Sequence, residues 1–131
     1  MRPIIMLGTS LAILVTVASR ESVAAQQSPI PGFACMSLNI SDAQAHDFNF
    51  HVPFYASPDP TSPTIGIASA SVAVRSPLHE VGAYAEAMML SGKTGWIAAR
   101  FLKPHFSPLD PSAKCIPVVL ATGRLGFAYL H

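Results

Sequence analysis

The chain has 131 residues, of which 50% are hydrophobic and only 11% are charged, and its formal net charge at pH 7 is +1. This length predicts one domain, or one small domain with extensions. The balanced charge lacks the basic patch that binding to nucleic acid or to an anionic membrane surface requires, and the hydrophobicity argues against a disordered chain. We therefore expect no nucleic-acid partner.

The first 25 residues are typical of a secretory signal peptide. Arg2 supplies a positive charge, residues 4–17 form an apolar run, and residues 23–25 (Val-Ala-Ala) are small enough for a cleavage site. The run has 14 residues, whereas a bilayer-spanning helix needs roughly 20. We predict cleavage after Ala25, or after Ala24, with a retained membrane anchor as the alternative. The mature chain is then periplasmic or secreted and has no membrane span.

Two cysteines, Cys35 and Cys115, remain in the mature chain. An even count in an oxidising compartment favours a disulfide, and only one pairing is available. Two buried free thiols are the alternative. The bond would close a span of 80 residues, for which chain-entropy models give a stabilisation of about 4–5 kcal/mol.

The residues that follow the signal, 26–49, are predicted to be an N-terminal extension. Residues 26–32 are rich in Ser, Pro and Gly and predict an irregular arm. Residues 36–40 alternate between apolar and polar side chains, which indicates a short strand. Residues 41–46 can form a helical turn capped by Ser41, although that turn is too short to be stable alone.

From residue 50 the pattern becomes that of β structure. Residues 50–55 alternate and predict a strand with one apolar face. Residues 57–63 contain three prolines and predict a fixed loop. Residues 64–68 and 70–74 are short, alternating and rich in β-branched side chains, as strands are. Residues 75–82 break the pattern.

A hairpin is predicted next. Residues 84–90 and 94–97 flank a turn in which Gly92 can adopt the positive φ that a tight hairpin requires. Ala and Met in the first run favour helix, but the run is short and has a turn signal at each end. Residues 98–102 fit a single helical turn that ends at Pro104. The prediction is an all-β fold, a small, partly open barrel of about five short strands with one helical turn.

These residues resemble a bacterial SH3-like (Src homology 3-like) domain. Residues 92–97 (Gly-Lys-Thr-Gly-Trp-Ile), followed by residues 98–102, look like the distal hairpin, the Gly-Trp strand and the helical turn that end such domains. Residues 55–58 (Tyr-Ala-Ser-Pro) resemble the start of its long first loop, and residues 65–67 (Ile-Gly-Ile) resemble the strand after that loop. Tyr84 departs from the pattern, because many members carry Trp there, and the family's Leu-Asn-Val-Arg element is missing.

The resemblance implies an SH3-like domain at residues 50–104 and a C-terminal extension at residues 105–131. Both ends of such a barrel emerge near each other, so Cys35 and Cys115 could meet and join the two extensions. The apolar residues 116–130 would then pack on that junction, with a strand beside the one predicted at 36–40.

The resemblance also implies a groove that binds extended peptides, because flat aromatic rings give contact area at a small entropic cost. Two tyrosines and a phenylalanine would line it, and two acids would attract a basic peptide group. The candidate ligand-binding residues are Tyr55, Asp59, Glu80, Tyr84 and Phe101. The alternative is that the rings are packing residues and that the acids are merely solvated.

Two functions follow from this interpretation. The first is a non-catalytic binding module for a peptide or a peptidoglycan-linked peptide in the bacterial cell envelope. The second is a structural or interaction protein that docks on another envelope protein through the barrel edge and the apolar C-terminal tail.

Catalysis is not expected. The sequence has no Gly-x-Ser-x-Gly elbow, and oxidised cysteines would supply no thiolate. His46 and His51, with Asp47 between them, match neither a helical HExxH site nor a Cys/His zinc site. We therefore expect no cofactor and no metal.

Overall fold

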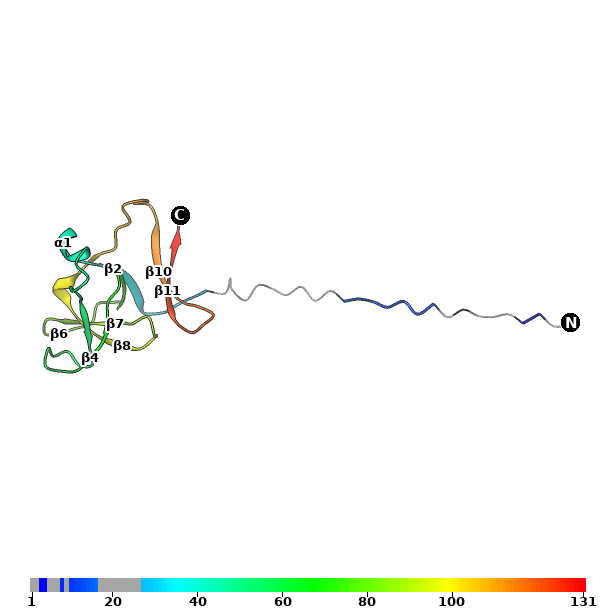
Figure 1. Ribbon diagram of the computed structural model, residues 1–131, viewed down its shortest axis with the longest axis horizontal. Coiled ribbons are helices and arrows are strands. Elements are labelled where there is room, and N and C mark those ends of the chain that lie inside the picture. The colour runs from blue at the N-terminus through cyan, green and yellow to red at the C-terminus, as the bar shows by residue number, and fades with distance from the viewer. Residues whose placement is uncertain (1–2, 5–7, 9, 17–26) are drawn as a thin grey trace.

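A computed structural model describes residues 3–4, 8, 10–16 and 27–131 of the protein. The predicted cleavage site at residues 24–25 lies outside the described residues. From residue 28 onward most of the regular structure consists of short antiparallel strands (Figure 1). In the described part of the chain, no helix reaches the length and hydrophobicity that crossing a bilayer requires.

Eight strands form the main sheet. In the order in which neighbours are hydrogen-bonded, seven of them are β4 (Thr64–Ile67), β3 (Pro53–Tyr55), β8 (Thr94–Ala98), β7 (Tyr84–Met88), β5 (Ser71–Arg75), β2 (Phe33–Leu38) and β9 (Leu102–Pro104). The eighth, β6 (Glu80–Val81), pairs only with β7. The sheet therefore ends at β4 on one side and at β9 on the other.

The predicted strands are confirmed in outline. The run from Tyr84 is strand rather than helix, and Gly92, at the hairpin between β7 and β8, has a φ of 88°. The strand expected at 50–55 is shorter and begins at Pro53. Predicted residues 98–102 contain η2, a single 3-10 turn (Ala99–Phe101).

The helical turn capped by Ser41 is also confirmed, as α1 (Asp42–Ala45). The Ser41 hydroxyl accepts a hydrogen bond from the Gln44 backbone N–H at 3.1 Å, and the Gln44 side chain accepts one from the Ser41 N–H at 2.9 Å. This reciprocal capping box satisfies two N–H groups that a helix start otherwise leaves without partners.

The main core lies on one face of this sheet. Side chains alternate along each strand, so every second residue of the central strands points into the core. In β7, Ala85 and Ala87 are fully buried, whereas Tyr84, Glu86 and Met88 are only partly buried and point to the opposite face, which we call the outer face. The buried core residues are Val52, Phe54, Val72, Val74, Ala85, Ala87, Met89 and Ile97.

Both extensions contribute to a second, three-stranded sheet. It consists of β1 (Ser28–Pro29), β10 (Lys114–Val119) and β11 (Leu125–Leu130), in that order. The arm at 26–32, expected to be irregular, thus contributes a short strand to β10. The tail does not hydrogen-bond to β2 as expected, because β5 and β9 already occupy the two edges of β2.

The predicted disulfide is confirmed. Cys35 in β2 and Cys115 in β10 are bonded, with their Cα atoms 5.9 Å apart. The bond fixes β10 beside β2, so that the small sheet is fastened to the main one (Figure 1). The mostly β architecture and the disulfide therefore agree with the prediction, whereas the main sheet has eight strands instead of about five, because β2, from the predicted N-terminal extension, and the short strands β6 and β9 also belong to it.

Candidate functional site

A row of side chains crosses the outer face of the main sheet. In the strand register, Tyr55 is opposite Trp96, Trp96 is opposite Glu86, and Arg75 is opposite Phe33. The ion pair between Arg75 and Glu86 joins the two halves of this row. With the two neighbouring rings of Tyr84 and His79, we call this surface the outer band: Phe33, Tyr55, Arg75, His79, Tyr84, Glu86 and Trp96.

The aromatic rings of the outer band contact one another edge to face. The Tyr55 and Tyr84 ring centroids are 5.7 Å apart with the planes at 89°. The His79 and Trp96 rings are 5.4 Å apart at 65°. Such T-shaped arrangements are favourable because the positive edge of one ring meets the negative face of the other. The rings are thus held in fixed orientations while they remain partly exposed.

Glu86 connects the charged members of the outer band. Its Oε1 atom lies 2.6 Å from Nη2 of Arg75, and its Oε2 atom lies 2.8 Å from Nδ1 of His79. The Arg75 guanidinium, and then His79, hold the pKa of Glu86 below its ordinary value, and Glu86 in turn raises the pKa of Arg75. The Arg75 guanidinium also lies 4.5 Å from the centre of the Phe33 ring. Charges and rings therefore form one connected surface.

The C-terminal hairpin covers only part of the outer face. Ala73 points to that face, since its neighbours Val72 and Val74 point to the core, yet Ala73 has no exposed surface. Ala73 is opposite Cys35 in β2, whose disulfide brings β10 here. The backbone N–H of Leu125 also bonds to the Leu90 carbonyl at 2.9 Å. These contacts lie beside the outer band, not on it.

The predicted groove residues are only partly brought together. Tyr55 and Tyr84 are in contact, as described above. Phe101 lies elsewhere, with its ring 6.2 Å from that of Phe50 and the Arg100 guanidinium over it at 4.6 Å. Phe101 packs against the core cluster.

The two predicted acids have separate environments. The Asp59 carboxylate accepts the Thr61 backbone N–H at 2.8 Å, and this bond lowers the pKa of Asp59. It therefore stabilises its own proline-rich loop. Glu80 is exposed in β6 opposite Ala85, whereas its neighbour Val81 is opposite Tyr84. Strand alternation thus places Glu80 on the other face of this pair from Tyr84.

Sequence reasoning omitted three polar members of the outer band: Arg75, His79 and Glu86. The sequence signal that could have found two of them is an outward-pointing arginine next to one predicted strand and an outward-pointing glutamate in the next predicted strand. Only the register, which brings these two residues together, shows that they form a pair.

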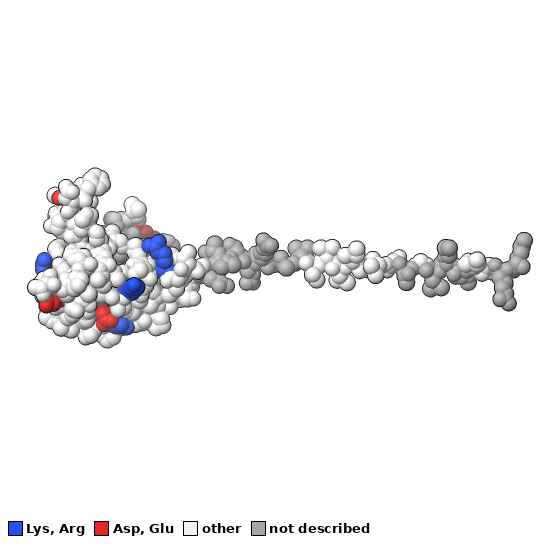
Figure 2. Space-filling view, turned by 60° about the horizontal axis from the view of Figure 1, so that its bottom comes forward, with Lys and Arg blue, Asp and Glu red and all other residues white. Residues whose placement is uncertain are grey.

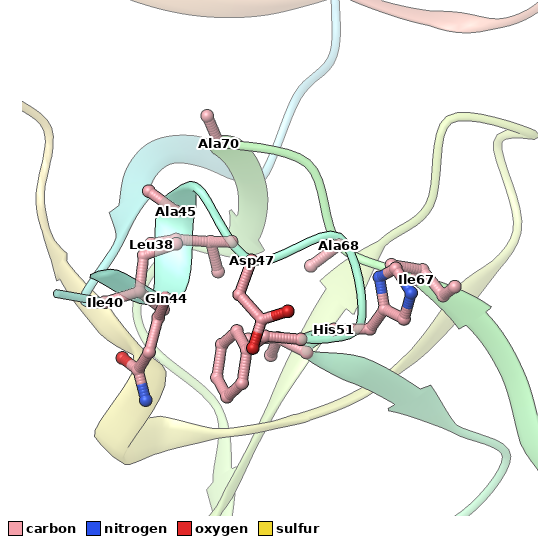
Figure 3. A pocket seen from close by; sticks show the side chains of 11 residues that line it. Leu38, Ile40, Gln44, Ala45, Asp47, His51, Ile67, Ala68 and Ala70 are labelled. Carbon is pink, nitrogen blue, oxygen red and sulfur yellow. The ribbon is translucent and has the colours of Figure 1, made fainter. Parts of the chain in front are cut away.

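Two cavities lie away from the outer band. The first, of about 250 Å³, opens beneath α1 and has mostly apolar walls (Figure 3). The polar side chains at this cavity are Gln44, Asp47 and His51, and Figure 3 shows the His51 ring beside Ile67. The second, of about 390 Å³, is lined by residues of β2 and of the segment after β9, including Ser37 and His105.

The face of the described residues that Figure 2 shows carries no concentrated charge. Figure 2 shows the Lys, Arg, Asp and Glu side chains of one face in ones and twos on a mostly uncharged surface. Within the described ranges, no three His, Cys, Asp or Glu side chains gather in a way that could hold a metal ion. No protein-family model, curated protein or solved structure matches the chain.

Proposed function

We propose that the protein is an exported, non-catalytic binding module of the bacterial SH3-like type, which binds a peptide of the cell envelope through the outer band. The stem peptides of peptidoglycan are the proposed ligand class. The observation that carries this proposal is the contact between Tyr55 and Tyr84 on the uncovered part of the outer face. Export rests on the signal-like residues 1–25, and the location is then the periplasm or the cell exterior.

The strand arrangement supports the SH3-like part of the proposal. The sheet is antiparallel, a hairpin with Gly92 joins β7 to β8, and a single 3-10 turn precedes β9, which is the last strand of the main sheet along the chain. This is the order of features that the sequence resemblance implies for residues 50–104.

The chemistry of the outer band supports a peptide ligand. Partly exposed Tyr and Trp rings provide large, rigid contact surfaces at a small cost in side-chain entropy. Arg75 and Glu86 already neutralise each other, so the band as a whole presents ring faces and edges rather than a strong field. An extended peptide with small or apolar side chains fits such a surface.

A pull-down with purified cell-wall sacculi tests the proposal. The mature protein should be retained, and Tyr84→Ala should reduce the retained fraction strongly. Tyr129→Ala is the matched control, because Tyr129 is a partly exposed tyrosine (47%) on β11, outside the outer band. Equal retention of all three proteins would exclude the outer band as the site. Retention of none would exclude the cell-wall ligand.

A further inference from the structure

We infer that the free edge of β4 and the cavity beneath α1 form a second docking site, which takes an extended peptide strand carrying an apolar and a basic side chain on one face. This site shares no residue with the outer band, and it does not rest on the function proposed above.

The first observation is the direction of the backbone groups in β4. The Ala68 N–H bonds to the Val52 carbonyl at 2.9 Å, and Gly66 is opposite Phe54. Ile67 lies between these two positions and is opposite Pro53, which has no N–H to donate. In an antiparallel ladder, hydrogen-bonded and non-hydrogen-bonded pairs alternate. The N–H and C=O of Ile67 therefore point away from β3, toward the open edge.

The second observation is that this edge is apolar and that no described strand covers it. No described strand pairs with the far side of β4. Ile65 and Ile67 are 42% and 56% exposed, and β4 carries none of the charged residues that commonly prevent edge pairing. An edge of this kind fits β-augmentation, in which the main-chain bonds of an added strand give affinity and pockets for its side chains give specificity.

The third observation is a pocket at the end of this edge. Ile67 and Ala68 belong to the wall of the cavity beneath α1 (Figure 3), which the core residue Val52 and the partly buried Phe50 also line. A strand that continues along β4 would therefore bring one of its side chains over this cavity. The apolar walls favour an aliphatic side chain there.

The negative charge at the cavity favours a basic residue as the next side chain on the same face of the added strand. Asp47 lines the cavity, and no lysine or arginine is among the lining residues. One oxygen of Asp47, Oδ1, already accepts the Asn49 N–H at 2.9 Å. The remaining carboxylate oxygen can accept a bond from a lysine or arginine on the same face of the added strand.

The probe is a blocked peptide of about eight residues with the repeat Val-Thr-Lys-Thr, which places Val and Lys alternately on one face of a strand. Two control peptides replace Lys by Glu, or N-methylate every second residue so that strand pairing is blocked. Isothermal calorimetry with the oxidised mature protein should show binding of the Lys peptide. The Glu and N-methylated peptides should bind at least about tenfold more weakly.

Two protein variants, each with a matched control variant, locate the site. Ile67→Lys should weaken binding of the Lys peptide at least about tenfold, whereas Leu109→Lys, the same kind of change at an exposed leucine outside the cavity, should have no effect. Asp47→Asn should remove the preference for Lys over Glu. Asp59→Asn is its matched control, because Asp59 also accepts an N–H from the residue two positions later.

Amide hydrogen exchange gives a readout that is independent of affinity. Saturation with the Lys peptide should slow exchange at Ile67 and leave Ala68, whose N–H already bonds to Val52, unchanged. The inference is overturned if the Lys peptide does not bind at millimolar concentration, or if the N-methylated peptide binds as tightly. It is also overturned if Ile67→Lys has no effect, or if the edge instead pairs with a second copy of the chain.

Discussion

Cys35 lies directly opposite Ala73 in the register of β2 and β5, on the face of the sheet that points away from the main core. Ala73 is nevertheless fully buried, because the disulfide from Cys35 to Cys115 holds the C-terminal hairpin over this part of the sheet. The sheet is therefore covered on both faces near Ala73 and on only one face at Trp96. The disulfide thus defines where the outer face is closed and where it stays open.

Loss of the disulfide should destabilise the whole protein. The bond joins residues 80 positions apart, and chain-entropy models give about 4–5 kcal/mol for a loop of this length. We expect the Cys35→Ala, Cys115→Ala double variant to lose up to that amount of unfolding free energy in urea titrations. Trp96, the single tryptophan of the chain, reports on the outer band.

Before unfolding, the Trp96 emission of this double variant should match that of the wild type, because the contacts of Trp96 lie within the main sheet. A native-state shift in that emission would mean that the hairpin supports the outer band as well. Equal unfolding free energies for the two proteins would contradict the stabilising role of the bond.

Glu86 should make stability depend on pH in the acidic range. Arg75 and His79 hold the folded-state pKa of Glu86 below the ordinary value of 4.5. A depressed carboxyl pKa contributes stability that is fully present above the unfolded-state pKa and is lost as the pH falls through the folded-state pKa. Glu86→Gln should therefore be less stable than the wild type at pH 7, and the gap should narrow below about pH 4.5.

Urea titrations of Glu86→Gln at several pH values measure this gap. Glu80→Gln is the control, because Glu80 lies on the neighbouring β6, outside the ion pair of Glu86 with Arg75. A gap between Glu86→Gln and the wild type that stays constant from pH 7 to acid would contradict the prediction, since the ion pair would then contribute nothing that depends on the charge of Glu86.

Local features of the fold could be predicted from the sequence where all the residues that determine them lie in one short segment. The cap at Ser41, the turn at Gly92 and the strand from Tyr84 each depend on neighbouring residues, and all three agree with the structure. The single pairing of Cys35 with Cys115 followed from counting.

Features that join distant segments were less predictable, because they depend on which strands are neighbours and on how those strands are aligned. The ion pair of Arg75 with Glu86 requires β5 and β7 to be adjacent in one alignment, and neither strand's pattern specifies its neighbour. The pairing of Ser28 with Val119 joins segments that lie far apart in the sequence. The family resemblance predicts Phe101 in one groove with Tyr84, whereas its ring packs on Phe50.

A side chain at Gly95 should destabilise the fold. A Cβ atom there would lie 3.0 Å from Cδ1 of Ile65 and 3.1 Å from the carbonyl oxygen of Tyr55, and the latter is backbone that cannot move alone. Gly95→Ala should cost about 1–3 kcal/mol of unfolding free energy. Gly126→Ala is the control in β11: a Cβ atom there would lie only 2.6 Å from Cδ2 of Leu120, but the three nearest atoms all belong to the Leu120 side chain, which can move away. A larger loss of unfolding free energy in Gly126→Ala than in Gly95→Ala would contradict this prediction.

The capping box should control the local opening of α1. No residue of this four-residue helix is buried, so its position over the cavity depends on the bonds between Ser41 and Gln44 rather than on the core. Removing an N-cap hydroxyl costs about 1 kcal/mol, which corresponds to about fivefold faster amide exchange. In Ser41→Ala, the amides of Ala45 and His46 should exchange faster by this factor, because their N–H groups bond within the turn.

Ser41→Asp keeps an oxygen acceptor at the cap and should restore slow exchange at these two amides. Because Gln44 and Ala45 line the cavity beneath α1, Ser41→Ala should also weaken binding of the Val-Thr-Lys-Thr peptide, while Ser41→Asp should not. Unchanged exchange in Ser41→Ala would mean that the segment between β2 and β3 holds α1 in place without its cap. Faster exchange with unchanged peptide affinity would instead separate the helix from the docking site.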